Sequence, residues 1–349
     1  MKRKIYEIDI IPYLVRLKTN VKKIPNFSLL SYKITENRIG MDMIKNKSKI
    51  EIEYIVNDKF VYQNDTLKLN NGDKLFKRIG NNKVYFQRSI GLGLSAKLLL
   101  EINNKYAKII VNNIYHRLNR MSINHLYSPG WHLLDVIDIK LLNIGYCLLH
   151  SAAFVYKNKG ILLVGLPNTG KTSTAYFFVS KCMAKYIAED ISVTNGKEVF
   201  TCPYTFSFVK PSVRSKKLKI YEKMVDFFPL LDHFRTPPLN SSLDIFGKDS
   251  LCLKEKIEYV FILNKGQRFV HPLDADIAKS KILLSNRAEF TYSNNPLLLS
   301  SQLLGLKVDV FKAIEKEAQI IESLVRNSHV YYLSGDTDYF IESIRSIVQ

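Results

Sequence analysis

Apolar and polar residues alternate along the first third of the chain, in short runs separated by turn residues. The segments 49–56 and 83–87 show the period of two that is typical of a strand with one buried face. Asn70-Asn-Gly-Asp73 is expected to form a turn between strand-like pieces. This pattern predicts a β-rich domain over residues 1–125, whose histidines and carboxylates form no compact constellation and therefore indicate no chemistry.

The pattern changes after the turn residues Ser128-Pro129-Gly130. From there on, apolar spacing predicts helices at 133–142, 172–185, 214–228, 308–326 and 336–348, and strands at 150–155, 160–164, 186–188, 259–263 and 330–333. Helices and strands in alternation are typical of an α/β domain. Since 349 residues exceed the usual size of one domain, we expect a second domain over residues 126–349.

One string in the second half has a known chemical use. Gly165-Leu-Pro-Asn-Thr-Gly170-Lys171-Thr172 matches the pattern GxxxxGK[ST], and it stands between a predicted strand and a predicted helix. In such a loop the glycines let successive N–H groups face phosphate oxygens, the lysine reaches the β- and γ-phosphates, and the hydroxyl coordinates Mg²⁺. The string predicts binding of ATP and Mg²⁺ through Gly165, Asn168, Thr169, Gly170, Lys171, Thr172 and Ser173.

Such loops usually work with a carboxylate at the end of a nearby strand. The strand 259–263 ends in Asn264, which cannot supply the charge. Glu189 and Asp190 follow the short strand at 186–188, so one could face the metal and the other an incoming hydroxyl. A GTPase base-recognition motif, an LSGGQ string and a helicase motif series are absent from the sequence.

The stretch from His150-Ser-Ala-Ala-Phe, through the loop to Ser173, and on to Ile187-Ala-Glu-Asp190 resembles the catalytic core of HPr serine kinase/phosphorylase. Phosphoenolpyruvate carboxykinase is a more distant relative with the same arrangement. The resemblance covers roughly residues 130–349 and is strongest over 150–190. It implies an α/β fold in which the second domain is a P-loop kinase domain with a mixed sheet.

The resemblance also implies a role for each matching residue. Lys171 would hold phosphates, and Thr172 and Asp190 would hold Mg²⁺. The pair of carboxylates would position or deprotonate an acceptor hydroxyl, and His150 would support a carboxylate. Glu189 stands where the family has aspartate, which leaves the assignment between Glu189 and Asp190 open. The implied activity is a kinase that moves the γ-phosphoryl group of ATP to a hydroxyl of a peptide, protein or small molecule.

The chain departs from the family before the predicted strand 259–263. The bifunctional HPr enzymes carry an Arg-Gly-x-Gly string there, whereas this chain has Arg235-Thr-Pro-Pro-Leu239. We therefore expect neither the phosphorylase activity nor HPr as the acceptor. Relatives of this fold often form rings, which leaves a homo-oligomer open.

Composition and charge define two alternative functions. Hydrophobic residues make up 46% of the chain and charged residues 24%, which indicates a globular protein. The formal charge of +19 favours acidic partners and raises the alternative of an ATPase stimulated by nucleic acid. Its lysines are spread along the chain, which favours a solvated surface instead. The Glu189 replacement raises the other alternative, a nucleotide-sensing module without turnover.

The remaining signals concern the compartment. The four cysteines form no CxxC pair and lack histidines at metal spacing, so they suggest neither a disulfide framework nor a zinc site. Charged residues and Pro12 interrupt the apolar start that an export signal would need, and no apolar run is long enough to span a bilayer. We expect a cytoplasmic protein.

Overall fold

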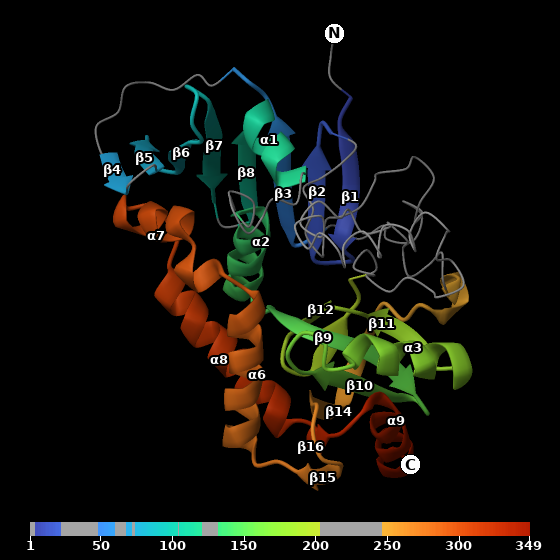
Figure 1. Cartoon of the computed structure of the whole chain (residues 1–349). Coiled ribbons are helices and arrows are strands. Elements are labelled where there is room, and N and C mark those ends of the chain that lie inside the picture. Colours follow the sequence, from blue (N-terminus) through green and yellow to red (C-terminus); the bar gives the residue numbers. More distant parts are fainter. Residues whose placement is uncertain are drawn as a thin grey trace.

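The computed structural model of the chain describes residues 4–21, 48–59, 68–71, 74–103, 105–120, 132–202 and 246–349. Within these ranges the protein is a mixed α/β structure with two mixed β-sheets (Figure 1). The predicted helix at 214–228, the turn at 128–130 and the departure at 235–239 lie outside the described residues. None of the helices that the structure describes is long and apolar enough to cross a membrane.

The first sheet contains the first eight strands, in the order β1-β2-β3-β8-β7-β6-β5-β4. They are β1 (Tyr6–Ile11), β2 (Val15–Thr19), β3 (Ile50–Val56), β4 (Lys68–Asn71), β5 (Lys74–Ile79), β6 (Lys83–Ser89), β7 (Ser95–Ile102) and β8 (Tyr106–Val111). The β2–β3 and β3–β8 pairs are parallel, whereas the other neighbours are antiparallel.

Burial alternates strictly along β3, β7 and β8, so this sheet has one core face and one polar face. Helix α1 (Asn113–Arg120) packs on β7, and α2 (His132–Asn143) packs on β3. On the polar face, Lys18 pairs with Glu51 at 3.0 Å. Lys108 pairs with Glu53 at 2.7 Å. Opposite charges across neighbouring strands stabilise this pairing and keep the face in water.

The second sheet has the order β10-β9-β12-β13-β14-β16-β15, with β11 paired to β9 and with β10 also paired to β14. Its strands are β9 (Cys147–Tyr156), β10 (Lys159–Val164), β11 (Lys185–Ala188), β12 (Ile191–Thr194), β13 (Glu198–Phe200), β14 (Lys254–Asn264), β15 (Phe269–Pro272) and β16 (His329–Ser334). Strands β10, β14 and β16 run parallel to one another. β9 is buried along nearly its whole length, because both faces of the sheet are covered.

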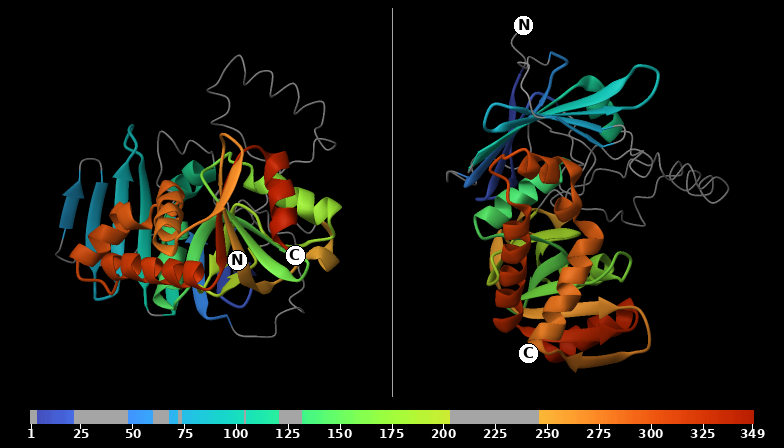
Figure 2. Two further views of the ribbon diagram at one scale, coloured as in Figure 1. Left: turned by 90° about the horizontal axis from the view of Figure 1, so that it is seen from below. Right: turned by 90° about the vertical axis from the view of Figure 1, so that its left-hand side faces the viewer.

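Two pairs of helices cover this sheet. Helices α3 (Lys171–Lys181) and α9 (Thr337–Ile347) pack together over one face, where Phe178 and Phe340 join a common apolar cluster. Helices α6 (Ala275–Glu289) and α8 (Val310–Arg326) pack together over the other face (Figures 1 and 2). Helix α7 (Pro296–Leu303) reaches β5 of the first sheet.

One apolar core continues from the first sheet into the second through α2. This helix is buried on every side except at Asn143, because it lies between the sheets and under α8. The centre of its His132 ring lies 5.3 Å from the centre of the Phe86 ring in the first sheet. Arg78 of β5 also donates a hydrogen bond of 3.0 Å to the carbonyl of Leu304. The strands of the two sheets are separate in sequence, and the boundary at 125/126 stays a prediction.

Most of the predicted elements that fall in the described ranges are present. The two strands of the first sheet, the strands before and after the loop, and the helices α2, α8 and α9 match their predicted places within a few residues. Helix α3 ends at Lys181, earlier than predicted, because Met183 has a left-handed φ of 55°. Helices α6 and α7 and several strands were not predicted, and part of the turn at 70–73 lies outside the described residues.

Candidate functional site

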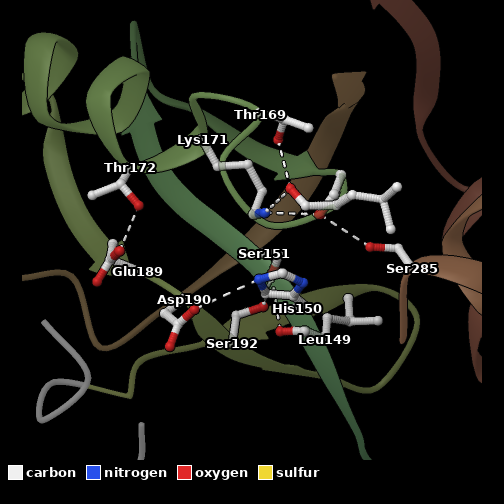
Figure 3. A network of polar contacts seen from close by, with 12 residues as sticks. Leu149, His150, Ser151, Thr169, Lys171, Thr172, Glu189, Asp190, Ser192 and Ser285 are labelled. Atoms are coloured by element: carbon white, nitrogen blue, oxygen red, sulfur yellow. Dashed lines mark hydrogen bonds and ion pairs between the residues drawn. The ribbon is translucent and has the colours of Figure 1, made fainter. Parts of the chain in front are cut away.

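The strand pairing brings three separate stretches of sequence together at the edge of the second sheet where β10 and β11 end, called here the carboxyl edge. β9 runs antiparallel to both β10 and β11, and its middle, at Ser151 and Ala153, lies beside the ends of those two strands. Val164, just before the loop, pairs with Ser151, and Ile191 pairs with His150. The Gly165–Thr172 loop, His150 and the Glu189–Asp190 pair are therefore neighbours (Figure 3).

The loop needs glycine at both ends for steric reasons. A Cβ at Gly165 would lie 2.7 Å from the Leu263 carbonyl oxygen. Gly170 has a φ of +105°, and a Cβ there would lie 3.0 Å from the Thr337 hydroxyl. Asn168 is exposed and has a φ of 63°, a conformation that asparagine tolerates better than most residues. These positions let the backbone turn tightly between β10 and α3.

Helix α3 begins directly after the loop, at Lys171. Gly170 is its N-cap, and no side chain among the described residues makes a capping hydrogen bond there. The first turn contains no acidic residue. Free N–H groups and the helix dipole make such a terminus attractive to an anion. Ser173, in the same turn, is exposed, whereas Thr169 is buried and its hydroxyl donates to the Leu166 carbonyl at 2.9 Å.

The Lys171 ammonium is turned back onto the loop. Nζ donates to the carbonyl oxygens of Gly165 at 2.7 Å and Leu166 at 3.0 Å, and the residue is 5% exposed. Burial lowers the pKa of Lys171 to about 8, and the nearby carboxylates of Asp190, Glu289 and Glu189 partly oppose that shift. A cation that lies this close to the loop can hold the phosphates of a ligand once it leaves the carbonyls.

The two adjacent carboxylates have different partners. The Thr172 hydroxyl donates to Oε1 of Glu189 at 2.5 Å, and Glu189 is buried. Asp190 has a left-handed φ of 69°, which turns its side chain away from that of Glu189 and places Oδ1 3.6 Å from Nε2 of His150. The backbone at Asp190 thus separates the two carboxylates into two environments.

His150 is a buried side chain within β9. Its backbone N–H donates to the Asn286 side-chain oxygen at 3.2 Å, which ties this point of the strand to α6. Its Nδ1 atom is buried and has no hydrogen-bond partner among the described residues. Next to it, the hydroxyls of Ser151 and Ser192 form a hydrogen bond of 2.6 Å (Figure 3).

Helix α6 contributes residues that the sequence pattern did not indicate. Ser285 donates a hydrogen bond of 3.1 Å to the carbonyl of Gly165, the oxygen that Lys171 also contacts. Glu289 lies one turn further along the same helix face. Desolvation raises the pKa of Glu289; His150 and Lys171 oppose this shift, and Asp190 adds to it. Glu289 is thus a third carboxylate within electrostatic reach of the loop.

The oxygen atoms at this edge suit a magnesium ion. Mg²⁺ prefers oxygen ligands and is usually held by one or two carboxylates together with phosphates and water. Thr172 and Glu189 already bring a hydroxyl and a carboxylate oxygen into contact, and Asp190 follows Glu189 in sequence. The described residues contain no group of three or more His, Cys, Asp or Glu side chains that could hold a metal by themselves. The donor set therefore fits an ion that a bound phosphate completes.

The likeness of this chain to known proteins is structural and distant. No family model matches the chain, and no curated protein matches it. Among solved structures, the chain is similar to the Hpr(Ser) kinase/phosphatase from Coxiella burnetii, with 9% sequence identity and a TM-score of 0.28. The match covers 58% of this chain and 93% of that one. At this TM-score the likeness establishes neither the activity nor the site.

Proposed function

We propose that this protein is a Mg²⁺-dependent kinase that transfers the γ-phosphoryl group of ATP to a hydroxyl acceptor. One observation carries the proposal: a GxxxxGK[ST] loop, two carboxylates with separate partners and a buried histidine meet at one edge of the sheet. Chemistry at the carboxyl ends of strands is the usual arrangement in α/β proteins. The acceptor is a hydroxyl of a peptide, a protein or a small molecule.

In this proposal the loop and Lys171 hold the phosphates. The N–H groups of the loop and of the first turn of α3 face the β-phosphate, and Lys171 moves from the two carbonyl oxygens to the β- and γ-phosphates. The Gly165 carbonyl keeps its bond from Ser285 when Lys171 leaves. The exchange removes two bonds from Lys171 and replaces them with charge-assisted contacts to phosphate.

The two carboxylates divide the remaining work. Glu189 and Thr172 would hold Mg²⁺, because they already share a short contact. This assignment moves the metal role from Asp190, where the family resemblance put it, to Glu189. The ion would neutralise charge on the phosphates. Asp190 would orient the acceptor and accept its proton, with His150 3.6 Å away to stabilise the carboxylate.

The transfer forms one bond to the γ-phosphorus and breaks another. The acceptor oxygen forms a bond to the γ-phosphorus while the bond from that phosphorus to the bridging oxygen of the β-phosphate breaks, which releases ADP. The proton of the acceptor hydroxyl passes to Asp190 and from there to solvent. Most of the rate enhancement would come from positioning and charge neutralisation, as in other phosphoryl transfers.

The test is transfer of label from γ-labelled ATP in the presence of Mg²⁺ and a lysate of the source cell, followed by identification of the labelled species. Lys171→Ala should abolish both nucleotide binding and labelling. Asp190→Asn keeps a residue that tolerates the left-handed backbone, so it should keep ATP affinity and lose labelling by roughly 100-fold or more. Asp276→Asn, an exposed aspartate on α6, is the matched control and should label at the wild-type rate.

Two results would contradict the proposal in different ways. If Asp190→Asn labelled the acceptor at the wild-type rate, Asp190 would not be the base. If the wild-type chain bound ATP tightly but neither hydrolysed nor transferred it, the protein would be a nucleotide-sensing module instead. A rise in hydrolysis on adding DNA or RNA, with binding that weakens steeply with salt, would favour the nucleic-acid-stimulated ATPase.

A further inference from the structure

The order of the strands along the carboxyl edge of the second sheet indicates on which side of the loop the nucleoside of a bound nucleotide lies. This inference rests on the proposed function. Along this edge the strands follow the order β11-β9-β10-β14-β16, and the loop stands at the end of β10. The groups that would act on the γ-phosphoryl, Glu189 and Asp190, stand at the end of β11, on one side of the loop. The nucleoside must then leave the loop on the opposite side, toward the ends of β14 and β16.

The segments that follow β14 and β16 form one continuous surface with the loop. The N–H of Gly335 donates to the Asn264 carbonyl at 3.0 Å. The backbone of Gly266 passes so close to Ser334 that a Cβ would lie 2.9 Å from its hydroxyl. On the other side, the Thr337 hydroxyl lies against Gly170 of the loop. These contacts fix residues 264–268 and 334–339 beside the phosphate end of the site.

On this surface an arginine contacts both a carboxylate and an aromatic ring. Arg268 donates from Nε at 3.1 Å and from Nη2 at 2.6 Å to one oxygen of Asp336. Its guanidinium carbon lies 5.6 Å from the centre of the Tyr339 ring. The side chains of Arg268 and Asp336 are 57% and 56% exposed.

Stability does not account well for this arrangement. An exposed ion pair contributes little to folding, because water screens it and two long side chains lose freedom. The Asp336 carboxylate also accepts from the Tyr339 N–H at 2.9 Å, so its position is fixed without Arg268. Gly335 leaves room for the ring, since a Cβ there would lie 2.7 Å from Tyr339 Cδ1. The result is an exposed arginine beside a half-buried aromatic ring, next to the loop.

We propose that Arg268, Asp336 and Tyr339 form the site for the purine nucleoside of the bound nucleotide. Nucleobases stack on aromatic rings and on arginine planes, and this stacking depends little on which base is present. Asp336 orients the guanidinium, and Arg268 and Tyr339 supply the stacking surface. ATP and GTP therefore bind with affinities within a few-fold of each other.

The experiment compares two ligands that differ only in the nucleoside. Calorimetry on the full chain with Mg²⁺ measures the affinity for ATP and for inorganic tripolyphosphate, which fills only the phosphate end. Arg268→Ala and Tyr339→Ala should each lower the affinity for ATP about five- to fiftyfold and leave the affinity for tripolyphosphate unchanged. Tyr339→Phe keeps the ring and should bind ATP like wild type. Arg326→Ala is the matched control, because Arg326 is 58% exposed and pairs with Glu322 far from the loop in sequence.

The possible outcomes separate this site from the proposed function. If both alanine variants bound ATP as wild type does, or lost affinity for ATP and for tripolyphosphate equally, the proposed nucleoside site would be wrong. The proposed kinase function would be unaffected. If wild-type protein bound neither ligand, or if Lys171→Ala left tripolyphosphate affinity unchanged, the phosphate end itself would be wrong. A preference for ATP over GTP of a hundredfold or more would overturn recognition by stacking alone.

Discussion

Two groups of buried and half-buried polar side chains lie on either side of Asn286, and they differ in what surrounds them. The first, called here the loop-edge cluster, consists of His150, Lys171, Glu189, Asp190 and Glu289. The second, called here the inner network, consists of Asp135, Asp138, Arg287, Tyr292, Asn295 and Glu317. Asn286 touches both, since its oxygen accepts from the His150 N–H and its Nδ2 donates to Glu317.

In the inner network two of the three carboxylates, Asp135 and Glu317, have fixed side-chain partners, whereas Oδ1 of Asp138 has no hydrogen-bond partner among the described residues. Glu317 accepts from Asn286 at 3.1 Å and from the Tyr292 hydroxyl at 2.7 Å, and it pairs with Arg287. Asp135 accepts from Thr291 and Asn295 in the same way. These groups are enclosed by α2, α6 and α8, so their charges serve the packing of helices on the sheet.

The loop-edge cluster contains a buried cation that donates to the main chain of the loop. Among the described residues, the Lys171 ammonium donates hydrogen bonds only to main-chain oxygens of the loop. Nδ1 of His150 has no hydrogen-bond partner there, but the same is true of Oδ1 of Asp138 in the inner network. Burial alone therefore does not mark a functional group in this protein. Position at the carboxyl edge of the sheet, beside a loop that suits an anion, separates the two groups.

The largest expected effect is on the inner network. Glu317→Ala leaves Arg287, Tyr292 and Asn286 without their shared partner and should lower the free energy of unfolding by about 3 to 5 kcal/mol. Glu322→Ala, on the same helix, removes a surface carboxylate that pairs with Lys279 and should cost less than about 1 kcal/mol. Urea denaturation of both variants measures the difference. A loss below about 1 kcal/mol for Glu317→Ala would contradict the structural role.

The next effect concerns the pH dependence of stability. Burial raises the pKa of Asp135 to about 7, against bonds from Asn295 and Thr291 that lower it. The folded state therefore holds this proton between pH 4 and 7 while the unfolded state releases it, so stability falls as pH rises through this window. The loss contributed by Asp135 is up to about 4 kcal/mol. It is complete above the folded pKa.

Asp135→Asn cannot titrate, so it isolates this contribution. The difference in unfolding free energy between variant and wild type should change across pH 4 to 7 in favour of the variant. Urea denaturation at several pH values gives both curves, and titration of other buried groups cancels in the difference. Parallel curves over this range would show that Asp135 keeps the same protonation state in both forms.

A smaller effect is expected at the loop edge. Burial lowers the pKa of Lys171 to about 8, and phosphates bind the charged form. Affinity for Mg–ATP should therefore fall about tenfold between pH 7 and 9 as the free protein loses this proton, which corresponds to about 1.4 kcal/mol. Lys171→Arg stays charged and should show no such fall. Calorimetry from pH 7 to 9.5 tests this. A constant wild-type affinity would show that titration of Lys171 does not control binding of Mg–ATP.

The comparison also shows which parts could be predicted from the sequence. The strand before the loop, the loop and the start of α3 were predictable, because their signals are local: a short apolar run, two glycines and an apolar helix spacing. Helix α7 carried a start signal that could have been used, since Asn295 caps it and Pro296 is its first residue. Asp274 gives the same kind of signal for α6.

Strand pairing and the residues from α6 could not be predicted, because they depend on contacts between distant segments. β14 lies beside β10 through pairs such as Ile161 with Tyr259, and nothing in either strand specifies that partner. Ser285 reaches the Gly165 carbonyl across 120 residues of sequence. The left-handed φ of Asp190, which separates its carboxylate from that of Glu189, was equally invisible in the sequence.

The smallest expected effect tests whether that backbone conformation is kept for function. Met183 and Asp190 both have left-handed φ values, and Met183 is 96% exposed after α3. Met183→Gly should raise the free energy of unfolding by about 1 kcal/mol without changing phosphoryl transfer, because glycine adopts this conformation without strain. Asp190→Gly should raise the free energy of unfolding by less than Met183→Gly does, because it also loses the contact with His150. The same variant should abolish phosphoryl transfer. Denaturation and labelling assays on both variants decide the matter. If Asp190→Gly were destabilised by more than about 1 kcal/mol, Asp190 would serve folding as the inner network does.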